Sequence, residues 1–381
     1  MKRSVLAGLI LGLVFSAQSA RADWIPAKRL TWSSDDSERP AIAIDSQGII
    51  HVVWNDGPLP YQEIYYRKST DGGMNWSALK RLTFTPYNSI APAIAIDSSD
   101  AIHVAWFDLS SGNSEIYYKR STDSGETWSA AQRLTWTQYE SSYASLAIGS
   151  DNSVHVVWQD KTPGSYQIFY KNRPHRGGIW GAVKGITYNS VGARYPVIAS
   201  DSSNGIHVVW FDYTPGNSEI FYRKSADGGT TWSPAKRLTY TSGGSAEPAM
   251  AIDSNDTIHV VWEDYTHLPE IYYKKSTDGG ETWSLAKRIT WTFDSYYAAI
   301  AVDYSNNLHL VWTDGNGSEN YEIYYEKSTD EGATWISARR LSWKSGRSYR
   351  PVLGLDANKT VHVVWQDNSP GNYEIYYRSG K

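Results

Sequence analysis

The chain of 381 residues contains no cysteine and only three methionines and seven phenylalanines. Without cysteine there can be no disulfides, so packing alone must stabilise the fold. No stretch after the first 22 residues approaches the run of about 18 apolar residues that a membrane helix needs. Lys and Arg number 36 against 40 Asp and Glu, so the chain lacks the positive charge expected of a nucleic-acid partner.

The first 22 residues have the pattern of an export signal. Two basic residues at positions 2 and 3 precede an apolar run over 5–15, and Ala-Arg-Ala at 20–22 is an A-x-A cleavage site. We expect residues 1–22 to be a signal peptide and residues 23–381 to form a single domain. The mature protein is then soluble and exported, either periplasmic or extracellular, with no membrane span.

One tract, Ile-His-Val-Val-Trp-x-Asp, is repeated seven times with light variation. Such a repeat, at intervals of 50 to 53 residues, indicates one structural unit copied along the chain. The repeated tryptophans are Trp54, Trp106, Trp158, Trp210, Trp262, Trp312 and Trp365.

Each copy divides into four short β-strands. In the second copy, alternating or β-branched residues at 92–97, 102–106, 115–120 and 131–135 are separated by polar turns. Four strands in about fifty residues, without helical periodicity, are typical of a propeller blade. The sequence therefore predicts an all-β, seven-bladed β-propeller of four-stranded antiparallel blades.

The two ends of the mature chain complement each other. The seventh copy ends after its third strand, whereas residues 24–31 match the fourth strand of the other copies. We therefore predict that the N-terminal strand completes the last blade, which closes the ring and covers a sheet edge.

Five turns between the third and fourth strands share the motif Ser-x-Asp-x-Gly-x-x-Trp. The glycine permits positive φ, and the Ser and Asp side chains can bond turn amides. A structural role is therefore predicted for the aspartates of these motifs, Asp71, Asp123, Asp227, Asp278 and Asp330.

These turns resemble the Asp-box (BNR) repeats of the sialidase-like β-propeller superfamily. The resemblance implies that the boxes lie on the face away from the ligand site. Family sialidases have six blades, an arginine trio for the substrate carboxylate, a glutamate-activated tyrosine nucleophile and an aspartate acid. Their Phe/Tyr-Arg-Ile-Pro motif is absent here in its family form; the nearest matches lie at 38–40, 194–196 and 349–351.

One position just before the inner strand differs in chemistry from copy to copy, and is either drift or a specialised site. In propeller geometry we expect these residues to border the central opening opposite the Asp boxes: Arg39, Ala91, Tyr143, Tyr195, Glu247, Tyr297 and Arg350. A sialidase-type glycosidase would use, by the resemblance, Arg39, Arg194, Arg350, Tyr143, Tyr195, Tyr297 and Glu247.

The connecting loops are nearly equal in length in all copies, which favours binding over catalysis, because catalytic groups need asymmetric support. Repeated weak sites on a rigid ring gain avidity for a repetitive target such as a glycan. Two sets of candidate ligand-binding residues are Trp106, Asp108, Asn113 and Glu115, and Trp210, Asp212, Asn217 and Glu219. Alternatively, each Trp-x-Asp caps its strand through local backbone bonds.

Seven histidines occupy one strand position, one in each blade, so they do not converge as metal ligands do. We expect no metal and no cofactor. Four further tryptophans near the rim are expected mainly to pack between blades, although they could stack on a sugar: Trp32, Trp136, Trp291 and Trp343.

The leading hypothesis is an exported, non-catalytic binding module for carbohydrate, acting through repeated blade sites. The first alternative is a sialidase-type exo-glycosidase. The second is a protein-interaction scaffold whose partner is an envelope or extracellular protein.

Overall fold

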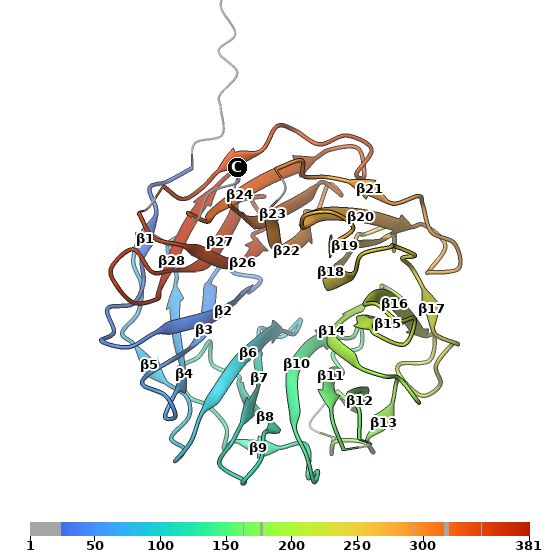
Figure 1. The fold of residues 1–381 in the computed structure, drawn as a ribbon. Coiled ribbons are helices and arrows are strands. Elements are labelled where there is room, and N and C mark those ends of the chain that lie inside the picture. Colours follow the sequence, from blue (N-terminus) through green and yellow to red (C-terminus); the bar gives the residue numbers. More distant parts are fainter. Residues whose placement is uncertain (1–23, 163, 176–177, 293, 316–319, 344) are drawn as a thin grey trace, which may run out of the picture.

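The computed structural model describes residues 24–381, except 163, 176–177, 293, 316–319 and 344. The described residues form seven four-stranded antiparallel sheets arranged around a central axis (Figure 1). The predicted seven-bladed β-propeller is therefore confirmed. Within these residues there is no helix of the length and hydrophobicity needed to cross a membrane. The predicted signal peptide lies outside the described residues.

The equivalent strands have the same length in all seven blades. The innermost are β2 (Ser37–Ile44), β6 (Ser89–Ile96), β10 (Ser141–Ile148), β14 (Ala193–Ser200), β18 (Ser245–Ile252), β22 (Ser295–Val302) and β26 (Ser348–Leu355). The second are β3 (Ile50–Asp56), β7 (Ile102–Asp108), β11 (Val154–Asp160), β15 (Ile206–Asp212), β19 (Ile258–Asp264), β23 (Leu308–Asp314) and β27 (Val361–Asp367).

The outer half of each blade follows the same pattern. The third strands are β4 (Glu63–Ser69), β8 (Glu115–Ser121), β12 (Gln167–Arg173), β16 (Glu219–Ser225), β20 (Glu270–Ser276), β24 (Glu322–Ser328) and β28 (Glu374–Gly380). The outermost are only two residues long: β5 (Lys80–Arg81), β9 (Gln132–Arg133), β13 (Lys184–Gly185), β17 (Lys236–Arg237), β21 (Lys287–Arg288), β25 (Arg339–Arg340) and β1 (Lys28–Arg29).

The inner strand of the second blade starts at Ser89, three residues before the predicted start at 92. The register between β6 and β7 shifts between Ile90 and Ala93, which is a β-bulge. All seven inner strands contain this bulge. The alternation rule misplaced the start because a bulge interrupts the two-residue period.

The hydrophobic core lies between neighbouring blades. One cluster joins Val364 and Ile375 of the last blade to Val52 and Trp54 of the first. Trp54 has no exposed surface, and the equivalent tryptophans of the other blades are at most 2% exposed. The repeated tryptophan therefore serves the packing of blade on blade.

The seven repeated histidines are part of a buried hydrogen-bond network rather than a metal site. His51 Nδ1 lies 2.8 Å from the hydroxyl of Tyr66, and its Nε2 lies 3.3 Å from Asp45, the aspartate that ends the inner strand. Tyr66 in turn donates to the carbonyl of Ser124 in the next blade, at 3.3 Å. The same histidine–tyrosine contact occurs in every blade, at 2.6 to 2.9 Å.

The Asp-box turns lie at the ends of the third strands, and their polar atoms bond within the turn. Asp123 Oδ1 accepts from Ser121 Oγ and Thr127 N, at 2.7 and 2.8 Å. The hydrogen bonds from Thr127 lower the pKa of Asp123 to about 2. Gly125 has φ of 82°, and a Cβ there would lie 2.1 Å from the hydroxyl of Tyr66. The glycine is needed for both reasons.

The N-terminal strand completes the last blade, as the chain ends predicted. Strand β1 pairs with β28, and Leu30 N donates to Ile375 O at 2.7 Å. Leu30 is 1% exposed and joins the core between the last and first blades. Figure 1 shows β1 beside β28, next to the first blade.

Candidate functional site

The bulge in each inner strand places one non-glycine residue at positive φ, between 47° and 54°. This left-handed conformation costs roughly 1–2 kcal/mol for a residue with a Cβ, so surrounding contacts must hold it. The seven residues are the non-repeating ones singled out in the sequence: Arg39, Ala91, Tyr143, Tyr195, Glu247, Tyr297 and Arg350.

Several of these bulges are held by a side chain of the preceding blade. Gln366 Oε1 accepts from the backbone N–H of Arg39 at 2.9 Å, and Gln159 Oε1 accepts from that of Tyr195 at 3.0 Å. Glu263 Oε1 does the same for Tyr297 at 2.6 Å. In each case the residue that accepts this hydrogen bond occupies the variable position x of the Trp-x-Asp tract.

All seven bulge residues line one cavity of about 310 Å³ at the ring axis. Residues at the start of β2 pair with the end of β3, and the start of β3 pairs with the end of β4, where the Asp box begins. The cavity and the Asp-box turns therefore lie on opposite faces of the ring. Its volume falls at the lower end of the range of about 300–1,000 Å³ typical of ligand pockets.

Cationic and aromatic groups contact each other within the central cavity. The guanidinium of Arg39 lies 5.4 Å from the ring centroid of Tyr143, because Ala91, in the blade between them, leaves the space open. The rings of Tyr143 and Tyr195 are 4.4 Å apart. On the other side, Arg350 lies 4.3 Å from the ring of Tyr297. Two arginines thus enter one cavity from the first and last blades.

These contacts shift the pKa values of two neighbouring tyrosines in opposite directions. Burial opposes ionisation of Tyr143, but the charge of Arg39 and hydrogen bonds from Tyr195 and Arg39 outweigh it and lower its pKa. Burial raises the pKa of Tyr195, and its hydrogen bond to Tyr143 adds to that effect. Burial also raises the pKa of Glu247, against the attraction of Arg350 and then Arg39.

Six of the seven residues predicted for a sialidase-type site meet in the cavity, and Arg194 does not. Its guanidinium lies 4.6 Å from the ring of Tyr166 and 5.9 Å from that of Tyr213. Arg194 precedes the bulge residue Tyr195, so the alternation of the strand directs it away from the axis. The central cavity therefore contains two arginines rather than three.

Glu263 is a residue of this region that the sequence analysis missed. It is 1% exposed and accepts a hydrogen bond from the hydroxyl of Tyr265 in addition to the bond from Tyr297. Burial and the nearby charge of Glu247 raise its pKa to about 8. The variable position within Trp-x-Asp was the available signal, because it differs between blades as the bulge position does.

The first set of predicted blade residues is largely engaged within its own blade. Trp106 is 1% exposed, and Asp108 and Glu115 are fully buried. Asp108 accepts from Ser110 N at 2.8 Å, and Glu115 accepts from Arg133 at 2.9 Å. The second set, Trp210, Asp212, Asn217 and Glu219, has the same pattern. In both sets the asparagine, Asn113 or Asn217, donates a hydrogen bond to a backbone carbonyl of the segment that follows the blade.

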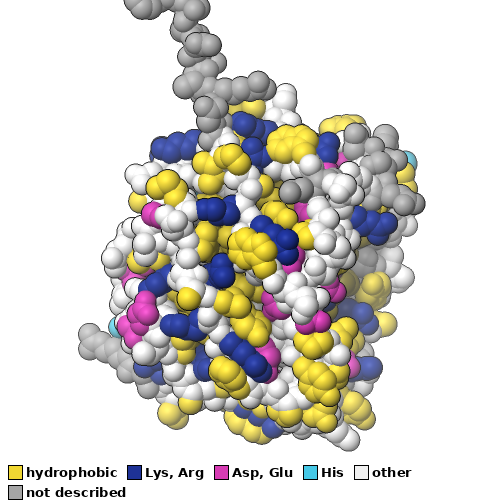
Figure 2. Space-filling view, turned by 90° about the vertical axis from the view of Figure 1, so that its left-hand side faces the viewer, with side chains coloured by type: hydrophobic (Ala, Val, Ile, Leu, Met, Phe, Trp, Pro, Cys, Tyr) yellow, Lys and Arg dark blue, Asp and Glu magenta, His cyan; other side chains and the backbone are white. Residues whose placement is uncertain are grey.

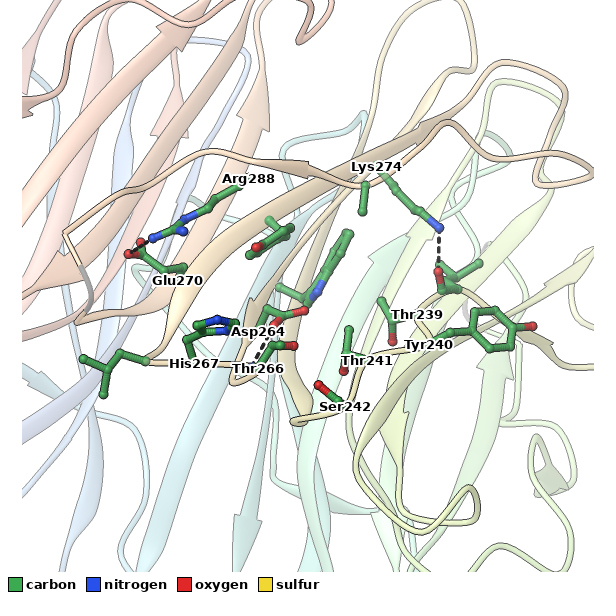
Figure 3. Close-up of a pocket in the computed structure, with 15 residues that line it drawn as sticks. Thr239, Tyr240, Thr241, Ser242, Asp264, Thr266, His267, Glu270, Lys274 and Arg288 are labelled. Atoms are coloured by element: carbon green, nitrogen blue, oxygen red, sulfur yellow. Dashed lines mark hydrogen bonds and ion pairs between the residues drawn. The ribbon is translucent and has the colours of Figure 1, made fainter.

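Pockets do occur between the blades, however, and residues of the Trp-x-Asp tract line them. One, of about 670 Å³, is lined by Trp262 and Asp264 of β19 and by Tyr240, which follows β17 of the preceding blade (Figure 3). Lys274 Nζ donates to the carbonyl of Leu238 at 2.6 Å across the junction. Equivalent pockets of about 320 and 240 Å³ lie at two other junctions.

An exposed aromatic ring stands at this position in all seven blades, with 58% to 76% of its surface accessible: Trp32, Phe84, Trp136, Tyr188, Tyr240, Trp291 and Trp343. An arginine three residues earlier often lies over the ring, as Arg288 does over Trp291 at 4.3 Å. Figure 2 shows hydrophobic side chains beside Lys and Arg on the outer wall of the ring. The four rim tryptophans are therefore exposed rather than packed between blades.

No cluster of three or more His, Cys, Asp or Glu side chains suited to a metal ion is found within the described part of the chain. The histidine ring nitrogens are instead bonded to tyrosine hydroxyls and to aspartates or a serine.

Comparison with known proteins identifies an Asp-box repeat in the chain. Residues 274–285 match the BNR/Asp-box repeat family model, which confirms the predicted repeat. Comparison with curated protein sequences gives no match. The chain thus contains an Asp-box repeat and has a β-propeller fold.

Solved structures share this fold at low sequence identity. A protein of unknown function from Dyadobacter fermentans is similar at a TM-score of 0.64 and 14% identity, over 94% of this chain and 99% of that one. An ulvan lyase, a polysaccharide lyase, is similar at 0.64 and 11%, over 92% and 95%. A leech intramolecular trans-sialidase is similar at 0.55 and 13%, over 93% and 70%.

Proposed function

We propose that this protein is an exported binding module for acidic carbohydrate and that the central cavity holds the acidic group. The observation that carries the proposal is the convergence of Arg39 and Arg350 on one cavity in a chain whose other features repeat. Guanidinium groups bind carboxylates with paired hydrogen bonds. Tyrosine hydroxyls and the carboxyl of Glu247 provide partners for sugar hydroxyls.

The known structures with this fold support the choice of an acidic sugar. The ulvan lyase was solved with a GlcA(1-4)Rha3S repeat bound, and the leech enzyme with 2,7-anhydro-Neu5Ac. Both ligands bear an acidic group. Interaction with an envelope or extracellular protein remains the alternative for a non-catalytic module.

The first prediction concerns Arg350. We expect Arg350→Ala to weaken binding of glucuronic acid or N-acetylneuraminic acid about 100-fold, because it removes charge-assisted hydrogen bonds worth about 1.5–3 kcal/mol each. Isothermal titration calorimetry measures this effect directly. Arg194→Ala is the matched control, since it removes an arginine beside the cavity, and its affinity is expected to stay within about twofold. Equal losses in both variants would argue against the site.

Catalysis is the second candidate function, and the divergent ionisation of Tyr143 and Tyr195 favours it. Paired groups whose pKa values are pushed apart are typical of acid–base sites. The same samples are to be tested for release of a fluorophore from a sialic-acid glycoside and for double bonds formed in uronate polymers. Turnover that Tyr143→Phe abolishes while binding persists would establish an enzyme; no turnover over a broad pH range leaves the binding module.

The pockets between blades supply the repeated sites of this proposal. Each combines an exposed aromatic ring with polar groups of the next blade, such as Asp264 and Lys274 with Tyr240. Sugars stack on such rings, and several equal sites on a rigid ring gain avidity.

A second prediction tests these pockets. A variant with alanine at Trp32, Tyr188 and Tyr240, one in each of the three pockets, is expected to lose about tenfold or more of its retention on immobilised polysaccharide, because avidity falls with each site lost. Affinity electrophoresis measures the retention. Tyr304→Ala, which removes an aromatic ring that is 77% exposed elsewhere, is the control. If the two variants are retained equally, the pockets between blades do not bind this ligand.

A further inference from the structure

Five tyrosines form a continuous cluster over the sixth and seventh blades, on the face that contains the central cavity. Tyr321 and Tyr349 have their rings 5.0 Å apart, and Tyr349 contacts Tyr297 at 6.2 Å and Tyr373 at 6.5 Å. Tyr296 joins the cluster through Tyr321, at 6.0 Å. The side chains come from β22, from β26 and from the connections that precede β24 and β28.

This cluster borders a second cavity of about 320 Å³, lined also by Glu38 and Gln366. Tyr297 and Arg350 line both this cavity and the central one. The two spaces are therefore neighbours that share a wall. We call the second cavity and the tyrosines that border it the tyrosine groove.

The fold does not require these tyrosines, as the other blades show. The residue before the bulge is tyrosine only in blades 6 and 7; across the seven blades it is Glu38, Ile90, Ser142, Arg194, Ala246, Tyr296 and Tyr349. The residue before the third strand varies as well: Gln62, Ser114, Tyr166, Ser218, Pro269, Tyr321 and Tyr373. The tyrosines thus gather on one side of an otherwise repeated ring.

The charges of the groove differ from those of the central cavity. Among the described residues that line the second cavity, only Glu38 and Arg350 are charged, and Arg350 stands at the shared wall. An acidic sugar placed beside Glu38 would be repelled. The hydroxyls of a neutral sugar, in contrast, can donate hydrogen bonds to the carboxylate of Glu38. Aromatic rings offer flat apolar faces suited to the C–H face of a sugar.

We propose that the ligand is an oligosaccharide in which a neutral sugar adjoins the acidic one. The acidic unit lies at Arg39 and Arg350, and the neutral neighbour lies in the tyrosine groove against Tyr349 and Tyr321. This inference rests on the proposed binding of acidic carbohydrate in the central cavity. It adds to that proposal that the ligand has at least two sugar units, one acidic and one neutral.

The test compares ligands of different length by calorimetry with the full mature chain. Glucuronic acid and N-acetylneuraminic acid probe the central cavity alone, and a hyaluronan tetrasaccharide and 3′-sialyllactose add neutral neighbours. The longer ligands are expected to bind about tenfold or more tightly than the monosaccharides. Tyr349→Ala is expected to remove this gain and to leave the monosaccharide affinities unchanged.

Two further variants control for folding and position. Tyr349→Phe preserves the ring and should preserve the gain. Tyr166→Ala removes a tyrosine equivalent in position to Tyr373 but outside the groove, and it should also preserve the gain. Equal affinity for short and long ligands, or a gain that survives in Tyr349→Ala, would overturn the inference while the central site stands. Failure to bind any of the four ligands would refute both proposals.

Discussion

A chain that begins at Ser33, and therefore lacks β1, is expected to lose its cooperative thermal unfolding transition. Removing β1 leaves β28 as an open edge and exposes the cores on both sides of the last blade. Trp24, 6% exposed, lies in the core between the sixth and last blades, and Leu30, 1% exposed, lies in the core between the last and first blades. No disulfide replaces this closure, since the chain has no cysteine. A chain that begins at Asp23 is the control and should unfold like the full-length protein.

A single substitution measures the same closure without removing backbone. Leu30→Ala is expected to lower the free energy of unfolding by about 2–5 kcal/mol, the cost of a cavity in a packed core. Leu285→Ala is the matched control, because Leu285 is 92% exposed; its change should stay within about 0.5 kcal/mol. Denaturant unfolding followed by tryptophan fluorescence gives both values. Similar stabilities for the two variants would mean that β1 contributes little to the closed ring.

Acid is expected to unfold the ring through its seven buried histidines. Burial lowers the pKa of His155 and His309 to about 4 and lowers the pKa of the other five as well. A histidine with a lowered pKa stays neutral when folded but takes up a proton when unfolded. Its contribution to stability is therefore complete above pH 6.5 and is lost as the pH falls toward 4.

Three buried glutamates have the opposite effect on the pH dependence of stability, but the seven histidines outnumber them. Burial raises the pKa of Glu263 to about 8, that of Glu326 to about 7, and that of Glu247. Because these folded carboxyls retain a proton that the unfolded chain releases, they add stability as the pH falls from about 8 toward 4.5. We therefore expect maximal stability near pH 6.5 to 7 and a steep loss below it.

The decrease in stability below pH 6.5, which we call the acid limb, has a measurable slope. Each excess proton bound by the unfolded chain costs about 1.4 kcal/mol per pH unit, so several histidines together should lower the melting temperature sharply between pH 6.5 and 4.5. Calorimetric scans at several pH values measure this. His309→Gln should flatten the limb, whereas His267→Ala, at an exposed turn, should not. A melting temperature that is constant or rises from pH 6.5 to 4.5 would contradict the role of the histidines.

The architecture could be predicted because its signals lie within each copy. The alternation of residues 102–106 and the turn before Trp128 are local features that seven copies repeat, and the match of residues 24–31 to a fourth strand needed no tertiary contact. Even the ring position that contains Arg39 and Arg350 was found by comparing copies. The bulge that gives this position its positive φ was missed, because it depends on strand register.

The composition of the candidate sites could not be predicted in the same way. The sequence predicted that Arg39 and Arg350 border the central opening, but not that Arg194, next to Tyr195 in the sequence, points to Tyr166 instead. The pockets between blades combine Tyr240 of one copy with Asp264 of the next. Such pairings are set by the packing of copies around the axis, which a motif within one copy does not encode.

The sequence by itself thus determined the all-β class, the number of blades, the strand that closes the ring and the Asp-box turns, since each depends on a local pattern that is repeated. Only the tertiary structure decided which variable side chains meet. It assigned the repeated histidines to buried tyrosines and aspartates, brought two of the three candidate arginines to the axis, and gathered five tyrosines into one groove. The physical reason is that a bulge, a blade twist and ring closure fix side-chain direction, and these arise from contacts between residues distant in the chain.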